Sequence, residues 1–154
     1  MNREKEKEDY ERNVFLKFAN LVELDIDYGS IRKGSKSNNE PDILCKFMSN
    51  ELVGFELGRL TDAKLREMIN RWEPRNGEYI RTRDHSKEIT RKKLKRKYSA
   101  SFPTELILYK ESPIITPDNV ILATIKPICQ SIVHNYKKIW YMSKEIEILY
   151  EKGQ

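Results

Sequence analysis

The chain of 154 residues lacks the sequence features of disulfide-rich proteins, membrane-spanning proteins and proteins with a phosphate loop or a zinc motif. Its only two cysteines, Cys45 and Cys129, lie far apart and form no paired motif, so the sequence predicts a reducing, cytoplasmic location rather than a disulfide framework. No apolar run reaches membrane-spanning length, and the first dozen residues are almost all polar, unlike a signal peptide. There is no glycine-rich phosphate loop, and no pair of histidines or cysteines has zinc-ligand spacing. We expect an intracellular protein that does not contact a membrane.

Basic residues are concentrated in one segment. Lys87–Lys97 (KEITRKKLKRK) holds seven of the 29 basic residues and one of the 24 acidic residues, so the rest of the chain is close to neutral although the net charge is +5. Such a patch attracts phosphate backbones through counterion release, without sequence specificity. We expect nucleic acid as the partner. The alternative is a solvated helix face with its countercharges elsewhere in the fold.

Hydrophobic periodicity predicts both helices and strands. The predicted helices are Lys5–Asn20, Thr61–Trp72, Ser86–Tyr98 and Thr116–Lys137. The predicted strands are Val22–Ile26, Asp42–Met48, Leu52–Leu57, Glu105–Lys110, Ile139–Met142 and Glu145–Tyr150, with Asp27–Pro41 as a loop. This order predicts one mixed α/β domain over residues 1–154, in which helices flank a central mixed sheet and a helix and a hairpin end the chain.

The two strands around Ser49 form a predicted antiparallel hairpin, and they bring two acids together. Residues paired across such a hairpin have a constant index sum, and a turn centred on Ser49 gives a sum of 98, which Asp42 and Glu56 satisfy. Two carboxylates this close are destabilising unless one is protonated or a cation lies between them, and oxygen ligands of this kind suit Mg²⁺ or Mn²⁺. The alternative is that one acid pairs with a nearby base such as Arg59.

Charged residues also fall on the predicted inner faces of two helices. In the basic helix, Lys93 and Lys97 lie within the arc bounded by its apolar residues, where they either reach along the apolar surface to water or point at an anionic group. In the first helix, Glu11 lies within the apolar arc bounded by Tyr10 and Phe15. In the sequence, these inward charged residues lie before and after the predicted hairpin.

Pro41-Asp42, followed by an acid on the next strand of a hairpin, resembles the PD-(D/E)XK nuclease superfamily. The order helix, strand, hairpin, helix, strand over Glu8–Lys110 is similar to the restriction-endonuclease-like core of that family. The resemblance implies a metal-dependent phosphodiesterase that acts on DNA in preference to RNA. In it, Asp42 and Glu56, with the Leu57 carbonyl, bind Mg²⁺ or Mn²⁺. It also implies that Glu11 joins the metal shell.

The sequence departs from the family pattern at the catalytic lysine, because Gly58 stands in its place. Some members take this lysine from the following helix, which nominates Lys93 or, failing that, Lys97. The spacing Lys93-x-x-x-Lys97-Tyr98 is also similar to a Gln-x-x-x-Tyr helix motif of certain DNA-repair members. The outward basic residues of the same helix are predicted to hold the nucleic-acid backbone: Arg91, Lys92, Lys95 and Arg96.

Two other functions remain open at this point. The first alternative to a nuclease is a catalytically inactive, nuclease-fold module that binds nucleic acid. The second is a small protein-interaction or immunity-type protein whose basic helix docks on an acidic partner. The sequence leaves the oligomeric state open, a homodimer included.

Overall fold

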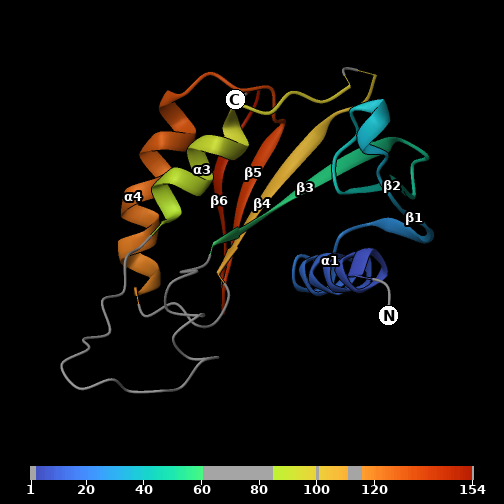
Figure 1. Ribbon diagram of the computed structural model, residues 1–154, viewed down its shortest axis with the longest axis horizontal. Helices are drawn as coiled ribbons and strands as arrows, with labels where there is room; N and C mark the ends of the chain where they lie inside the picture. The colour runs from blue at the N-terminus through green and yellow to red at the C-terminus, as the bar shows by residue number, and fades with distance from the viewer. Residues whose placement is uncertain (1–2, 61–84, 100, 111–115, 154) are drawn as a thin grey trace.

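The computed structural model describes residues 3–60, 85–99, 101–110 and 116–153, and in these ranges the chain forms one mixed β-sheet with helices on both faces (Figure 1). The strands follow the order of the sequence, β1-β2-β3-β4-β5-β6. Their bounds are β1 Ile26–Lys33, β2 Ile43–Phe47, β3 Leu52–Leu60, β4 Thr104–Lys110, β5 Lys138–Met142 and β6 Ile146–Glu151. The central strands β3, β4 and β5 are parallel, and the other neighbours are antiparallel. The predicted α/β class with a mixed, helix-flanked sheet is confirmed.

Helix α1 (Arg3–Leu21) covers one face of the sheet, whereas α3 (Ser86–Leu94) and α4 (Asp118–Ser131) cover the other (Figure 1). Odd-numbered residues of β3 such as Phe55 pack towards α1, and the even-numbered Leu60 packs in the cluster that includes residues of α3 and α4. The central strands are therefore buried on both faces, as is typical of parallel strands with helical connections. Among the described helices none is both long and apolar enough to cross a membrane.

Aromatic contacts hold α1 against the sheet. The rings of Phe15 and Phe18 are fully buried, and their centroids lie 4.8 Å and 6.1 Å from that of Phe55. Phe18 also meets Trp140 of β5 edge-on at 5.1 Å. Aromatic pairs in tilted or edge-on geometry add to the free energy gained from burial alone. The predicted first helix is confirmed, with two more residues at its start.

The predicted strand over Val22–Ile26 is wrong. These residues form the exit from α1, where the amide of Val22 donates to the Phe18 carbonyl and Glu23 has a positive φ of 52°. Strand β1 instead begins at Ile26 and runs through half of the segment that was predicted to be a loop. Its pairing with β2 is irregular between Asp27 and Arg32. A polar, irregular strand is tolerated here because β1 is the edge of the sheet and one side of it faces solvent.

Two predicted helices are shorter in the structure. Helix α3 ends at Leu94, its last buried apolar residue, and the hydroxyl of Tyr136 donates to the Lys93 carbonyl at 2.8 Å in the final turn. Such a side-chain donor satisfies a carbonyl that the end of the helix leaves without a partner. Helix α4 ends at Ser131, and Ile132 is already extended. The predicted helix Thr61–Trp72 lies outside the described residues.

Candidate functional site

The hairpin of β2 and β3 has the register that the sequence predicts. Ile43 pairs with Phe55 and Leu44 with Gly54, so the index sum of 98 is confirmed. Asp42 directly precedes β2 and contacts Glu56 of β3. The Asp42 amide donates to Glu56 Oε1 at 3.1 Å, and the Leu57 amide donates to Asp42 Oδ2 at 2.9 Å. The two acids therefore lie side by side.

Both acids are removed from water. The Glu56 side chain is 0% exposed and that of Asp42 is 8% exposed. Burial alone would raise the pKa of Asp42, but hydrogen bonds from its surroundings, with Glu56, Lys36 and the Leu57 amide, lower that pKa to about 2. Asp42 is therefore ionised at neutral pH, directly beside a second buried carboxyl group. Charges of one sign at this distance need cations close by.

Three bases from separate segments neutralise the acid pair. Lys36 of the short 3-10 helix η1 (Lys36–Asn38) lies 2.9 Å from Asp42 Oδ1. Lys93 of α3 lies 2.8 Å from Glu56 Oε2, and Arg96, just beyond that helix, lies 3.1 Å from the same oxygen. Pairing with bases, the alternative to a metal, is thus present in the structure. Arg59 is the base that the sequence analysis expected to pair with one of the acids. Its guanidinium carbon lies 5.2 Å from the centre of the Tyr10 ring.

The close approach of Leu108 explains why glycine occupies position 58. A Cβ atom at Gly58 would lie 2.6 Å from Leu108 Cδ2 and 3.5 Å from Lys93 Cγ. The stem of Lys93 passes that point at an ordinary van der Waals distance. Its ammonium reaches the acid pair from the helix instead of from the strand. The predicted inward direction of Lys93 is confirmed, and its role in catalysis stays a prediction.

Glu11 of α1 approaches the same pair from the opposite side. Burial, then the charge of Asp42 and a hydrogen bond with it, raises the pKa of Glu11 to about 7. The structure thus brings Glu11 and Asp42 together, as the helical wheel suggested. Within the described part of the chain, however, no three histidine, cysteine, aspartate or glutamate side chains are grouped so as to hold a metal ion. Metal binding by Glu11 stays a prediction, as does metal binding by the Leu57 carbonyl.

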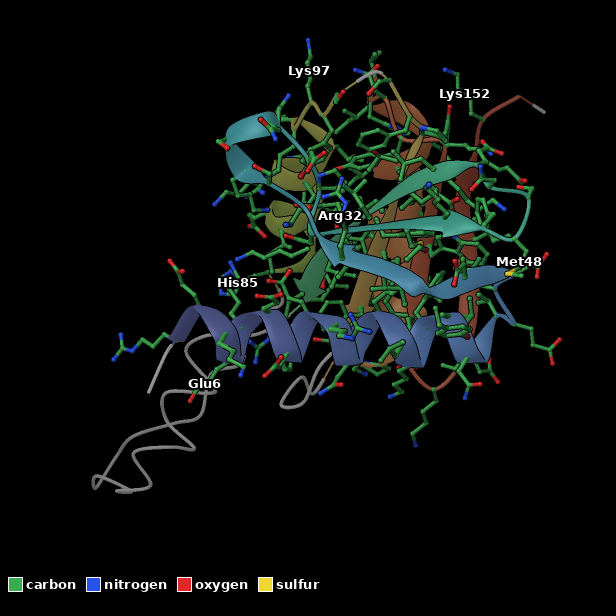
Figure 2. The ribbon with its side chains drawn as sticks, turned by 90° about the vertical axis from the view of Figure 1, so that its right-hand side faces the viewer. Glu6, Arg32, Met48, His85, Lys97 and Lys152 are labelled. Atoms are coloured by element: carbon green, nitrogen blue, oxygen red, sulfur yellow. The ribbon has the colours of Figure 1, made fainter. Side chains whose placement is uncertain are left out.

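Two predicted site residues are placed differently. Lys97 was expected on the inner face of a helix, but α3 ends at Leu94, and Lys97 is exposed at the end of the molecule remote from α1 (Figure 2). Its predicted inward orientation is wrong, and so is the placement of the Lys93-x-x-x-Lys97-Tyr98 spacing on one helix. Arg96 was expected to face outward, yet it contacts Glu56 because the chain turns inward after the helix ends. The remaining predicted backbone contacts, Arg91, Lys92 and Lys95, are exposed.

Two residues of the site were not predicted. Lys36 belongs to a polar stretch that the sequence presents as a loop, and no periodic signal points to its contact with Asp42. Tyr98 lies beside the pair on the other side. Burial, followed by its interaction with Glu56, raises the pKa of its hydroxyl. The sequence placed Tyr98 among the apolar residues of a helix, but only the tertiary contacts bring it to Glu56.

A cleft gives access to the acids between α1 and the first strand. It has a volume of about 230 Å³. Its lining includes both signs of charge: Glu11 and Asp42 from the site, with Lys7, Arg12, Arg32 and Lys36 around them. Figure 2 shows Arg32 on the side of the sheet edge that faces the viewer. Asp42 is therefore reached through an opening lined by side chains of both charges, Glu4 and Glu8 among them.

The arrangement joins two carboxylates, a backbone amide and three cations at the point where the hairpin meets α3. Carboxylate oxygens are suitable ligands for hard divalent cations, and a lysine at the same point is able to stabilise an anion. No family model matches the chain, and no curated protein and no solved structure is significantly similar to it.

Proposed function

We propose that the chain is a metal-dependent phosphodiesterase that hydrolyses nucleic acid, DNA in preference to RNA. The observation that carries this proposal is the contact of Asp42, directly before β2, with Glu56 of β3, with the Lys93 ammonium 2.8 Å from Glu56. The order of α1, β1, the β2–β3 hairpin, α3 and β4 supports a restriction-endonuclease-like core. A site, not a fold, determines function, and these three side chains form the site.

The site contains two carboxylates, which are ligands that Mg²⁺ and Mn²⁺ prefer. They belong to Asp42 and Glu56, and their mutual repulsion favours a cation between them. Asp42, Glu56 and the Leu57 carbonyl would hold the ion, and Glu11 would complete the shell. When bound, it would polarise the phosphate and favour ionisation of a water ligand.

The remaining roles follow from position and charge. Lys93 would orient the attacking water and stabilise the charge that develops on the phosphate, because its ammonium is held at the acid pair. The exposed residues Arg91, Lys92 and Lys95 would hold the nucleic-acid backbone.

The test is cleavage of labelled DNA and RNA in Mg²⁺ or Mn²⁺ by the wild type and by lysine variants. Lys93→Met should abolish cleavage while nucleic-acid binding remains, because the exposed bases are unchanged. Lys97→Met should remain active, since its side chain is exposed. A wild-type protein that cuts neither polymer refutes the proposal, and cleavage by Lys93→Met refutes the role of that lysine.

A nucleic-acid-binding module without catalysis is the second candidate, favoured by one observation. Protein cations already contact both carboxylates, through Lys36 at Asp42 and through Lys93 and Arg96 at Glu56. Such a closed cluster needs no metal for charge balance. Salt-sensitive binding of DNA, without cleavage in either metal, would support this function.

A further inference from the structure

A second cavity adjoins the acid pair on the side of Arg96 and Tyr98. Its volume is about 650 Å³, within the range of pockets that hold small molecules. Four segments form it: the chain after α3, the approach to β4, the approach to β5 and the end of β6. Its lining residues are Arg96, Tyr98, Ser99, Ser101, Phe102, Pro103, Thr104, Asn135, Tyr136, Lys137 and Lys152.

The cavity is basic and aromatic. Three cationic residues line it, Arg96, Lys137 and Lys152, and none of the described residues in its wall is acidic. Both lysines are exposed, and Figure 2 shows Lys152 at the same end of the molecule as Lys97. Arg96 is already paired with Glu56, so Lys137 and Lys152 supply the positive charge that suits an anion.

The sheet holds this wall in place. The Lys137 amide donates to the Thr104 carbonyl and the Lys152 amide donates to the Lys137 carbonyl, each at 2.9 Å, so the strand ladder continues into the cavity wall. Phe102 packs towards Gly54, since a Cβ atom there would lie 2.9 Å from Phe102 Cε2. A preformed wall binds a ligand without an ordering cost.

The aromatic residues suit a planar ligand. Tyr98 and Phe102 are partly exposed, and buried Tyr136 lies behind Tyr98 with ring centroids 6.3 Å apart. Binding of single-stranded nucleic acid requires aromatic side chains next to positively charged side chains. The unpaired nucleobases stack on the aromatic rings, and the phosphates contact the cations. In a duplex the bases stack on each other, and their faces are not available to a protein ring.

We infer that this cavity binds an unpaired nucleotide, so that the substrate is single-stranded nucleic acid. The inference rests on the proposed function, because Arg96 both lines the cavity and contacts Glu56, which joins the bound strand to the acid pair. The base packs against Phe102 and Tyr98. The phosphates contact Lys137 and Lys152.

The experiment measures binding separately from cleavage. Fluorescein-labelled 15-mers of deoxythymidine and of uridine, and a blunt DNA duplex of equal length, are titrated in EDTA and followed by anisotropy. Each single strand, or one of the two if the sugar matters, should bind at least about tenfold more tightly than the duplex, because only unpaired bases reach the rings. The two single-stranded arms distinguish DNA from RNA.

Three variants test the cavity itself. Phe102→Leu retains apolar packing but removes the ring, and it should weaken single-strand binding at least about fivefold. Lys137→Gln and Lys152→Gln should each lower the slope of log K against log salt by about 0.7. Lys17→Gln, an exposed lysine of α1 that does not line the cavity, is the matched control and should leave the slope unchanged. Circular dichroism verifies that each variant is folded.

The possible outcomes separate the two proposals. Equal affinity for duplex and single strand, or variants of the cavity that bind like the control, would overturn the inference whether or not the protein cuts. Single-strand binding that depends on Phe102, Lys137 and Lys152 would support it even if Mg²⁺ produced no cleavage. In that case the nuclease proposal alone would fail.

Discussion

The ion pair of Lys93 and Glu56 should dominate the stability of the site. Its nitrogen and oxygen are 2.8 Å apart, and the exposed fractions of the two side chains are 16% and 0%. Removing one partner of a buried pair costs about 3–5 kcal/mol, because the other charge stays buried. Arg96, which contacts Glu56 at 3.1 Å, is unchanged in the variant. We therefore expect Lys93→Met to lower the free energy of unfolding by less than that, about 2–3 kcal/mol.

The opposite substitution, Glu56→Gln, should cost less. The Asp42 amide retains an oxygen acceptor at position 56, and the loss of one charge relieves the repulsion of Asp42. The Lys93 ammonium is partly exposed and is able to reach water. We expect a loss of about 1–2 kcal/mol in the free energy of unfolding. In the double variant both charges are absent, so its loss should be smaller than the sum by at least about 1 kcal/mol.

Chemical denaturation in EDTA measures the four free energies, provided that the denaturant slopes agree. Lys95→Met removes an exposed lysine of the same segment, and as the control it should change stability by no more than about 0.5 kcal/mol. If the two single losses add to the double within about 0.5 kcal/mol, the coupling is absent. The coupling is also absent if Lys93→Met lowers the free energy of unfolding no more than Lys95→Met does.

Three further predictions concern other parts of the site. Gly58→Ala should lower the free energy of unfolding by about 1–3 kcal/mol in a denaturant titration, because the new Cβ meets Leu108 Cδ2 at 2.6 Å; an unchanged stability would contradict the packing. In metal-free buffer the wild type should lose stability as pH rises from about 4.5 to about 7, because Glu11 in the folded state keeps its proton longer than in the unfolded chain; Glu11→Gln should remove this part of the pH dependence, and identical profiles would refute it. Neutralising Lys92 and Lys95 together should lower the slope of log K against log salt for duplex DNA by up to about two, and an unchanged slope would show that these side chains do not face the phosphates.

The sequence predicts the hairpin register because one turn determines it. Once Ser49 is taken as the centre, each pair has the same index sum, and a slip of one residue would turn every apolar side chain to the wrong face. The direction of Lys93 is predictable for a related reason. Its angle relative to the apolar residues Ile89 and Leu94 is determined by helical geometry alone.

The errors occur where tertiary contacts override local pattern. Strand β1 is polar, and only its pairing with β2 makes it a strand, so its sequence resembles a loop. The prediction for Lys97 required the helix to continue after Leu94, where the last buried contact of α3 is made. Beyond that residue the wheel no longer applies, and Arg96 turns to Glu56. Lys36 reaches Asp42 through a loop whose path no periodicity describes.

The three cations of the site differ in how firmly the fold holds them. The side chain of Lys93 is 16% exposed, whereas those of Lys36 and Arg96 are 54% and 40% exposed. An ion pair that is open to water contributes little stability, and its release restores side-chain freedom. A cluster that served stability alone would gain most by burying every counterion. The difference in exposure between Lys93 and the other two cations suits the proposed function better, because Lys36 would leave Asp42 at small cost when a metal binds. Lys93 would stay beside Glu56, where hydrolysis of a phosphodiester needs a fixed positive charge.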